Sequence, residues 1–571
     1  MLCDRFQDHA IDRPFHDHTR KGREIMKLGI PIEERYFEKP KRLRTASGYP
    51  VKEIYEPEDI KGTDYRRDIG RAGEYPFTRG IFPDMYRGRM WSLREICGYD
   101  SPRRTNERIK FLLSEGESAL NVIPDLPTQN GIDSDHPRAQ GSVGVQGPPW
   151  CSMQDMEIMM EGVPFEGVSM TLSVYLMPVF VFYITAAEKA GASLKNLRGT
   201  ILNDTLSFPL VRFNAPVVPQ DVGIRMTTDT ILFCDQFVPK FYPLNVGSEG
   251  LRESGATAAQ EIAFDFCLAR HYIKNALKRG GDIDKIARRI TFTHRCGIDI
   301  FEEVAKFRAA RRVWARMMKE EFGAKDPRTM TYKVHVVTKG SDLIPQQPEN
   351  NIVRIAYQAL AAVLGGVQSV HTTSYDEPIC LPTEESQRIA VRTQQILAYE
   401  TGVVNVADPL GGSYYVEYLT NKLDEEITKI MDELKDRIAE YAWEGKLLEM
   451  MHKNAVEEQK EIENGEKIVV GLNRFTVSEE AEREIEIHEP SQDAVNEHLN
   501  NLKKLRETRD TEAVRMKLEE LRKAIEIPDK NTVPYVMEAA RVYATLGEIM
   551  GVFRMAYGHP YDAFGDLEYP F

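Results

Sequence analysis

Between about residue 75 and residue 400, short β-rich apolar runs alternate with amphipathic helical patterns. The strand-like runs are SALNVIPDLP, GVSMTLSVYL, TMTYKVHVVT and GVQSVHTTSYDE, and the helical patterns include SGATAAQEIAFDFCLARHYIKNALKRG and IFEEVAKFRAARRVWARMMKEEFG. Strands and helices that alternate over roughly 300 residues indicate an α/β protein with a parallel sheet, and this length predicts a (β/α)8 TIM barrel. A doubly wound open sheet is the alternative.

The chain divides into three regions by texture. Residues 1–70 are rich in Pro, Lys, Arg and Glu with little periodicity, which predicts an extended N-terminal arm. Residues 71–415 hold the expected barrel, and residues 416–571 form a charged, helical C-terminal region. The last pattern, VMEAARVYATLGEIMGVFRMAYG, predicts one apolar helix that docks on a core or a partner.

Charge and cysteine usage exclude several classes of protein. The net charge of −14 argues against nucleic acid as the main partner, because such proteins usually show a basic face. The seven cysteines are scattered without a CxxC pair, which indicates reduced thiols in a cytoplasmic protein and predicts no metal site. The charged N-terminus lacks the apolar core of a secretory signal.

One segment imitates a membrane span. Residues 168–187, VSMTLSVYLMPVFVFYITAA, run for twenty positions without a charge, which is long enough to cross a bilayer. The run nevertheless carries several hydroxyls and a proline near its middle. We therefore predict a buried strand that leads into a buried helix, and no membrane partner.

Common catalytic motifs are absent from the sequence. It holds no GxGxxG after a strand, no GxxxxGK[ST], no HExxH and no GxSxG. Nucleotide-binding, zinc-protease and serine-hydrolase interpretations therefore lack support.

The stretch YPFTRGIFPDMYRGRMWSLRE gathers arginines and aromatic rings in a segment punctuated by glycine. With later pieces in the same order, it resembles the large, substrate-binding subunit of the methylmalonyl-CoA mutase family. Those pieces run from about residue 73 to 475 and include DLPTQNGIDSDHPRAQGSVG, GTILNDTL, ESGATAAQEIAF, EVAKFRAARRVWA, NNIVRIAYQALAAVLGGVQSVHTTSYDE, LPTEESQRIAVRTQQIL, DPLGGSYYVE and VVGLNRF.

The resemblance implies a TIM barrel threaded by the pantetheine arm of an acyl-CoA, with adenosylcobalamin at one end. In this family the cobalamin-binding domain is marked by DxHxxG, and none of the twelve histidines here lies in that pattern. The resemblance therefore implies one subunit of a hetero-oligomer that binds adenosylcobalamin with a separate small subunit. A G-protein chaperone is a further candidate partner.

The resemblance also assigns roles to individual residues. It implies that Arg212 grips a free carboxylate of the substrate. It implies that substrate and CoA are bound by Arg89, Ser92, Arg94, Asn121, Thr200, Arg289, Thr291 and His335. It implies that the cofactor is bound by Pro124, Leu126, Gln129, Glu253, Gly340, Thr373 and Glu377.

The sequence departs from methylmalonyl-CoA mutases at the substrate end. Ile96 replaces a tyrosine beside the substrate carboxylate, and 2-hydroxyisobutyryl-CoA mutases also carry isoleucine there. Glu249 and Gly250 replace a tyrosine and the histidine that polarises the thioester carbonyl, so both belong, with Arg212 and Ile96, to the catalytic positions. Leu202 and Val337 stand where the family places glutamines.

The resemblance predicts an isomerase that catalyses radical carbon-skeleton rearrangement of an acyl-CoA. Arg212 favours a dicarboxylic acyl group. The altered positions leave two alternatives open: an enzyme like 2-hydroxyisobutyryl- or isobutyryl-CoA mutase, or a non-catalytic CoA-binding assembly subunit.

Overall fold

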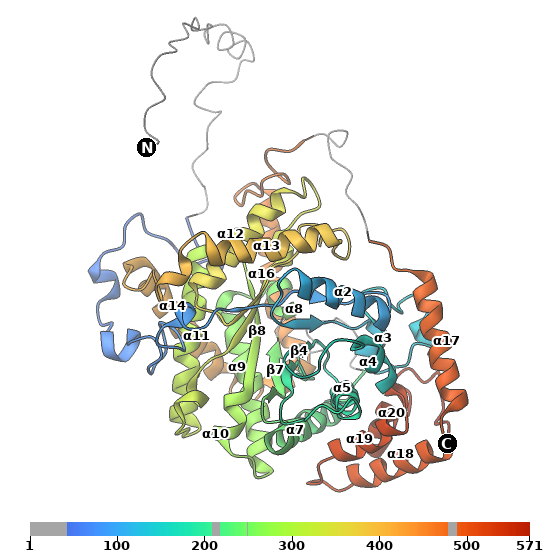
Figure 1. Cartoon of the computed structure of the whole chain (residues 1–571). Helices are drawn as coiled ribbons and strands as arrows, with labels where there is room; N and C mark the ends of the chain where they lie inside the picture. Colours follow the sequence, from blue (N-terminus) through green and yellow to red (C-terminus); the bar gives the residue numbers. More distant parts are fainter. Residues whose placement is uncertain (1–42, 208–216, 248, 478–487) are drawn as a thin grey trace, which may run out of the picture.

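The computed structural model describes residues 43–207, 217–247, 249–477 and 488–571 (Figure 1). Its strands are β1 Ser92–Leu93, β2 Ile96–Cys97, β3 Leu120–Val122, β4 Ser169–Leu172, β5 Arg198–Ile201, β6 Phe241–Tyr242, β7 Leu244–Gly247, β8 Ile290–Cys296, β9 Val334–Thr338 and β10 Ser369–His371. They form two five-stranded sheets in the orders β1-β10-β9-β8-β7 and β2-β3-β4-β5-β6, and every pairing is parallel. The prediction of an α/β protein with parallel strands is confirmed.

Helices surround the two sheets (Figure 1). In the first part of the chain they are α2 Pro102–Ser114, α3 Leu126–Gln129, α4 Met153–Met159, α5 Met177–Lys189, α7 Gln220–Phe237, α8 Glu249–Glu253, α9 Ala258–Lys278, α10 Ile283–Ile286, α11 Ile300–Arg316, α12 Asn350–Leu364 and α13 Glu384–Tyr399. In the C-terminal region they are α14 Tyr414–Leu434, α15 Ile438–Trp443, α16 Lys446–Glu463, α17 Gln492–Thr508, α18 Thr511–Ile525, α19 Val533–Arg541 and α20 Leu546–Ala556.

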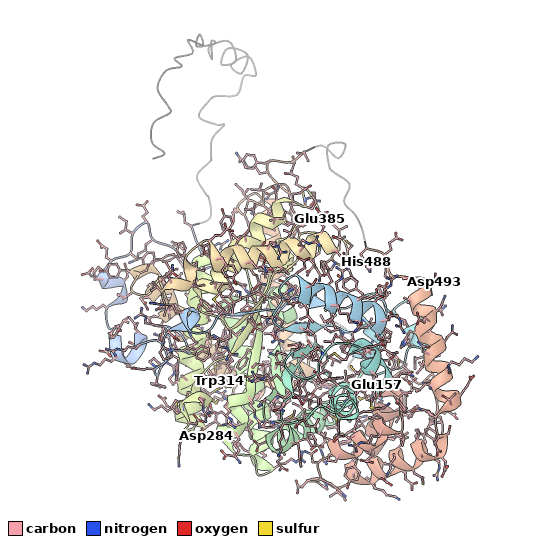
Figure 2. The ribbon with its side chains drawn as sticks, in the orientation of Figure 1. Glu157, Asp284, Trp314, Glu385, His488 and Asp493 are labelled. Atoms are coloured by element: carbon pink, nitrogen blue, oxygen red, sulfur yellow. The ribbon has the colours of Figure 1, made fainter. Side chains whose placement is uncertain are left out.

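Each strand buries its apolar side chains against the covering helices. On β8, Phe292 packs against Phe266 of α9 and Trp314 of α11, with ring centroids 5.2 and 5.0 Å apart. Trp314 is fully buried and lies well inside the molecule in Figure 2. The next residues on either side, Thr291 and Thr293, belong to the opposite face of the sheet because side chains alternate along a strand.

The charge-free segment 168–187 folds as predicted, since β4 leads into α5 and every side chain of α5 from Met177 to Ala187 is buried. Among the described residues, no helix combines the length and the hydropathy that a membrane span requires. The described cysteines are free thiols, which agrees with the prediction of reduced cysteines for that part of the chain.

The last helical pattern forms two helices, α19 and α20, so the prediction of one continuous helix was wrong. Tyr543 has a positive φ of 61°, and Thr545 begins α20 with a capping box that it shares with Glu548. The predicted docking face is nevertheless buried: Val536 and Phe553 join the hydrophobic cluster that contains Leu120 of β3. The C-terminal helices therefore pack on the same core as the sheet.

Candidate active site

Small polar side chains line the sheet faces that point away from the covering helices, which we call the inner faces. On neighbouring strands their apolar partners belong to the helix-packed clusters, so the polar residues share the other side. The inner-face residues are Ser169, Thr171, Thr200, Asn245, Thr291, Thr293, His335, Ser369 and His371, together with Asn121 of β3.

Hydrogen bonds connect these side chains across the strands. Ser173 donates to Asn121 over 2.6 Å, and Thr293 donates to the Asn245 side chain over 2.8 Å. The same Asn245 amide donates to Thr291 over 2.9 Å. These side chains are held in fixed positions around the inner faces.

The strand register brings predicted substrate-binding residues into rows. Ile96 pairs with Asn121, Asn121 with Thr171, and Thr171 with Thr200. In the other sheet, Ser92 pairs with Ser369, which pairs with His335. Residues far apart in the sequence are therefore brought together at the inner faces.

Arg94 places a buried guanidinium against β3 and β4. It donates to the carbonyl of Leu120 over 3.1 Å, to Ser169 over 2.9 Å and to the Thr171 hydroxyl. No carboxylate of the described residues lies within ion-pair distance of Arg94. Burial lowers its pKa to about 10, so it remains protonated at neutral pH and can accept an anionic or polar ligand group.

His335 contributes an imidazole with one free nitrogen. Its Nδ1 lies 3.0 Å from the Ser369 hydroxyl, whereas its buried Nε2 has no hydrogen-bond partner. Burial, followed by the charges of Arg94, His371 and Arg295, holds the pKa of His335 well below its usual value. A neutral imidazole can therefore offer Nε2 to a ligand.

Glu95 and His371 form a pair that sequence reasoning missed. Glu95 Oε2 lies 2.5 Å from His371 Nδ1, and the Ile96 N–H points to the same nitrogen over 3.0 Å. The buried Glu95 carboxylate is fixed by Thr372 and Gln394, over 2.6 and 2.8 Å. The signal in the sequence was a histidine at the carboxyl end of a strand, since such positions face the active side of a barrel.

Several predicted cofactor residues meet at the carboxyl ends of β7, β9 and β10, beside Arg295 of β8. The Glu253 carboxylate accepts the N–H groups of Gly340 and Ser341 over 2.9 and 2.8 Å and pairs with Arg295 over 3.1 Å. Burial opposes ionisation, yet the Arg295 charge and these hydrogen bonds hold the pKa of Glu253 below its usual value. A Cβ at Gly340 would lie 3.3 Å from the exposed Glu377 carboxylate, so glycine keeps this corner open.

The other predicted cofactor residues follow β3 and β10. Gln129 is buried at the end of α3, the helix that Leu126 begins. Its amide donates to the Pro124 carbonyl over 3.2 Å, and its Oε1 has no partner. After β10, Thr373 bonds to Thr338 through both its N–H and its hydroxyl, over 2.8 and 2.9 Å.

Two predicted CoA contacts lie away from the inner faces. Arg89 is exposed and lies over the Phe82 ring, 5.9 Å from its centroid. Arg289 precedes β8 and donates to the Cys234 carbonyl and to Asp235, each over 2.8 Å. The Arg289 guanidinium is therefore held at the end of α7 by these two hydrogen bonds.

The predicted catalytic positions are only partly visible. Arg212 and the side chain of Glu249 lie outside the described residues. Gly250 is half-buried in α8, directly after β7. Apolar side chains occupy nearby positions: Leu202 contacts Tyr175, and Val337 is fully buried on β9.

Comparisons with known proteins agree with this geometry. Residues 44–559 match the family described as Methylmalonyl-CoA mutase. The chain is 35% identical over 531 residues to the 2-hydroxyisobutanoyl-CoA mutase large subunit of Aquincola tertiaricarbonis, which covers 91% of this chain and 93% of that protein. It is 36% identical over 519 residues to the methylmalonyl-CoA mutase of Rhizobium meliloti, covering 90% of this chain and 72% of that protein. It is 35% identical over 511 residues to the methylmalonyl-CoA mutase large subunit of Porphyromonas gingivalis, covering 89% of this chain and 71% of that protein. The chain therefore belongs to the methylmalonyl-CoA mutase family, whose members are acyl-CoA mutases and thus isomerases.

Proposed function

We propose that this chain is the large subunit of a coenzyme-B12-dependent mutase that rearranges the carbon skeleton of an acyl-CoA. The polar lining of the inner faces carries this proposal. A barrel interior is ordinarily filled by bulky Val, Ile and Leu side chains. Hydroxyl and amide side chains such as Thr171 and Asn245 are polar instead, so they can bond to the amides of a threaded pantetheine arm.

We further infer that the two sheets close into one eight-stranded barrel. Only Arg94 and Glu95 separate β1 from β2, and only Pro243 separates β6 from β7, so each pair acts as one bent strand. The β7 end joins the other sheet, since the Asn245 N–H donates to the Leu202 carbonyl over 3.0 Å. The two sheets also meet beside β1. There the Arg94 N–H donates to the Val370 carbonyl of β10 in one sheet, and the Arg94 guanidinium donates to the Leu120 carbonyl of β3 in the other.

The residues at the inner faces suit the binding of CoA. Arg94 supplies a buried cation, and Ser92, Asn121, Thr200, Thr291 and His335 supply hydrogen-bonding groups along the strands. The exposed Arg89 can meet a CoA phosphate outside the strands. In this assignment Arg289 positions the end of α7, and it contacts CoA only at the edge of the binding site.

The residues at the carboxyl ends of the strands suit the binding of adenosylcobalamin, together with a separate small subunit. Gly340 leaves space between the Glu253 and Glu377 carboxylates, and the Gln129 Oε1 is an unpartnered acceptor on the loop after β3. When bound, this cofactor supplies radical chemistry. The role of the chain is to bind and orient the acyl group and to exclude water from it.

The acyl end favours a substrate other than the methylmalonyl group, either a larger dicarboxylic acyl group or a less polar one. Ile96, Leu202 and Val337 present apolar side chains, and Gly250 presents none. Arg212 supports a dicarboxylic acyl group, while the apolar lining and the relative from Aquincola tertiaricarbonis favour an acyl group like 2-hydroxyisobutyryl. These are the two candidate substrate classes.

A panel assay tests the proposal. The chain is purified with its cobalamin-binding subunit, and methylmalonyl-, ethylmalonyl-, isobutyryl- and 2-hydroxyisobutyryl-CoA are screened for isomer formation by mass spectrometry. We expect one of the larger or 2-hydroxylated substrates to have the highest kcat/KM. Isomer formation from none of them, with CoA still bound, would instead support an assembly subunit.

The Arg212→Gln variant separates the two substrate classes. If Arg212 pairs with a substrate carboxylate, this change should cost about 2–5 kcal/mol in transition-state binding for a dicarboxylic acyl-CoA. The same change should leave a substrate without a second carboxylate nearly unaffected. Equal turnover of the dicarboxylic substrate by variant and wild type would show that Arg212 does not bind that carboxylate.

A further inference from the structure

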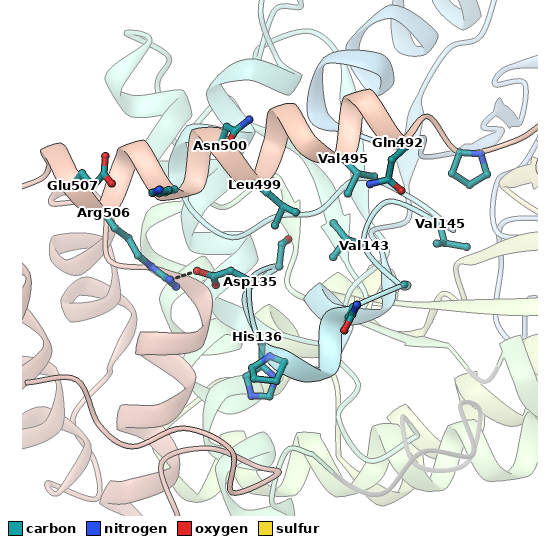
Figure 3. A pocket seen from close by; sticks show the side chains of 16 residues that line it. Asp135, His136, Val143, Val145, Gln492, Val495, Leu499, Asn500, Arg506 and Glu507 are labelled. Atoms are coloured by element: carbon teal, nitrogen blue, oxygen red, sulfur yellow. Dashed lines mark hydrogen bonds and ion pairs between the residues drawn. The ribbon is translucent and has the colours of Figure 1, made fainter.

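Four consecutive polar side chains, Asp133, Ser134, Asp135 and His136, each bond to the C-terminal helical region. We call them the 133–136 anchor. Asp133 pairs with Arg506 of α17 over 2.6 Å and accepts the hydroxyl of Thr545 over 2.6 Å. Asp135 also pairs with Arg506, and both line a cavity of about 990 Å³ between the anchor and α17 (Figure 3).

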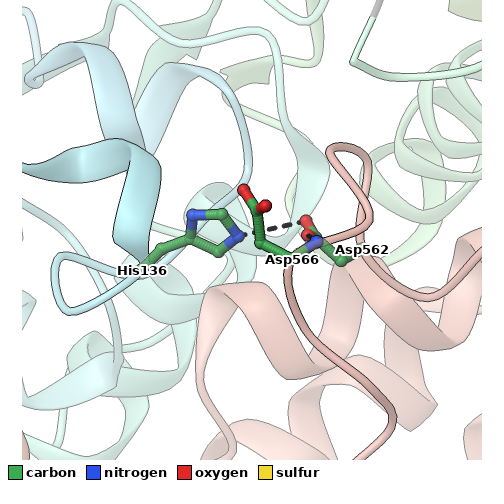
Figure 4. Close-up of side chains that lie close together, drawn as sticks. All are labelled: His136, Asp562 and Asp566. Carbon is green, nitrogen blue, oxygen red and sulfur yellow. Dashed lines mark hydrogen bonds and ion pairs between the residues drawn. The ribbon is translucent and has the colours of Figure 1, made fainter.

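The other two residues of the anchor reach different parts of the same region. The Ser134 hydroxyl lies 3.0 Å from Nε2 of His498 on α17. His136 Nε2 lies 3.1 Å from Asp562 in the C-terminal tail (Figure 4). The anchor therefore fixes α17, the start of α20 and the tail through separate contacts.

The contacts of Asp133, Ser134 and His136 are largely shielded from water, whereas the Asp135–Arg506 pair lies at the surface. Asp133, Ser134 and His136 are 6%, 5% and 5% exposed, and His498 is 4% exposed. A buried polar group that loses its partner is strongly unfavourable, because water cannot replace the bond. The C-terminal region is thus locked to the anchor.

The anchor continues directly from the loop that carries predicted cofactor contacts. Gln129 ends α3, and Asp133 follows four residues later. Asp125, which caps α3, accepts the Thr128 N–H over 3.0 Å and the Gly144 N–H over 3.1 Å, so it ties the two ends of the 125–144 loop together. A shift of the anchor must therefore move or strain α3.

A second set of contacts holds the far side of this loop. The Leu546 N–H of α20 donates to the Cys151 carbonyl over 2.7 Å, and the Trp150 N–H donates to the Thr128 hydroxyl over 2.8 Å. The C-terminal helices thus hold the chain on both sides of α3.

We propose that the C-terminal helical region, through the 133–136 anchor, positions the α3 loop for binding of adenosylcobalamin. The inference rests on the proposed function in one respect, namely that the ligand beside the α3 loop is adenosylcobalamin. Arg506 and His498 act through the loop and touch no substrate, so they are positioning residues.

Arg506→Met tests the proposal in the full chain. Hydrogen exchange of the chain alone should become faster at the amides of residues 124–147 and remain unchanged in the inner strands. In the complex with the small subunit, the apparent Kd for adenosylcobalamin should rise about tenfold, within the usual range of coupling between sites. The KM for the acyl-CoA should stay within about twofold, because the inner faces are not touched.

Three further variants make the result specific. Arg506→Lys keeps a cation beside Asp133 and should restore part of the affinity. Arg515→Met removes an arginine from α18 whose ion pairs, among the described residues, are with exposed Glu512 and Glu519, so it should behave like wild type. Ser134→Ala, a smaller change at the same anchor, replaces Arg506→Met if the latter fails to fold, and the same shifts are expected.

The outcomes separate this inference from the proposed function. A wild-type complex that binds no adenosylcobalamin would overturn the proposed function. Hydrogen exchange at the amides of residues 124–147 would still test the positioning role in that case. A working wild type whose Arg506→Met variant keeps both its cofactor affinity and its loop protection would overturn the inference. A parallel rise in acyl-CoA KM and cofactor Kd would also overturn it, since that marks general destabilisation.

Discussion

Arg94 shows how one residue connects the fold to the proposed activity. It sits between β1 and β2, and its donors reach β3 and β4 while no carboxylate of the described residues neutralises it. An unpaired buried cation is unfavourable for stability, and replacing such a group by an apolar side chain of similar size is often neutral or stabilising. A residue of this kind is best explained by a ligand that it binds.

Arg94→Met should therefore weaken CoA binding without unfolding the protein. Hydrogen bonds from a charged donor contribute about 1.5–3 kcal/mol, so we expect a loss of about 10- to 100-fold in affinity. The thermal midpoint should stay the same or rise. Calorimetric titration of the chain with coenzyme A measures the first effect, and Arg103→Met, at an exposed pair with Glu497, is the matched control. An unchanged affinity would remove Arg94 from the binding site.

At the residue scale the sequence predicted positions better than partners. The resemblance assigned Arg94, Asn121 and His335 to the substrate. The parallel register places Asn121 and His335 at the inner faces, and the Arg94 guanidinium donates to Ser169 and Thr171 beside them. It could not indicate the Glu95–His371 pair, because 275 residues separate Ile96 from the histidine that its N–H meets. Such contacts arise from strand pairing, which one sequence does not display.

At the scale of elements, periodicity predicted the long helices and missed a break. The apolar spacing of residues 536–553 continues through Tyr543, so the pattern looked unbroken. A hydroxyl that caps a helix start and also bonds to a distant carboxylate, as Thr545 does with Asp133, can be recognised only in the folded chain. The break between α19 and α20 is therefore stabilised by tertiary contacts.

Thr545→Ala should destabilise the protein more than the loss of an ordinary helix cap. A cap contributes about 1 kcal/mol, and leaving Asp133 short of a buried donor adds about 1–3 kcal/mol. Ser491→Ala, at the cap of α17, serves as the comparison because that side chain accepts the Ala494 N–H over 3.3 Å and no other donor of the described residues. Urea unfolding of the three proteins measures the difference. Equal losses for both variants would mean that the Thr545–Asp133 bond adds nothing.

At the scale of the whole molecule, a buried aspartate makes stability depend on pH. Burial, followed by the nearby Asp265 charge, raises the pKa of Asp204 to about 7. Its folded-state pKa lies above its unfolded value, so its stabilisation is complete below about pH 4 and is lost as pH rises through about 7. Asp125 and Asp133, whose pKa values burial raises to about 6, act in the same direction.

We therefore expect the thermal midpoint to fall as pH rises from about 4 to about 7, and Asp204→Asn to reduce that fall. The variant keeps an oxygen for the Tyr272 hydroxyl, which donates to Asp204 over 2.9 Å. The pH-dependent contribution should be on the order of 2–4 kcal/mol. Calorimetric scans at several pH values measure it, and the exposed Asp493→Asn is the control (Figure 2). A fall of the same size in Asp204→Asn would assign the effect to other groups.

The chain alone should retain no adenosylcobalamin, because its predicted contacts lie at a single edge. Glu253, Gly340 and Glu377 lie at the carboxyl ends of the strands, where Glu377 is exposed, and the DxHxxG histidine motif is absent. A corrin held on one face only loses the contacts that a second surface would supply, so we expect a small subunit to complete the site. Titration of the purified chain should leave the visible spectrum of the cofactor unchanged, and gel filtration should separate the two. The complex with the small subunit should retain the cofactor under the same conditions. Stoichiometric retention by the chain alone would show that its own residues form both faces, and the division of the site between two subunits would be wrong.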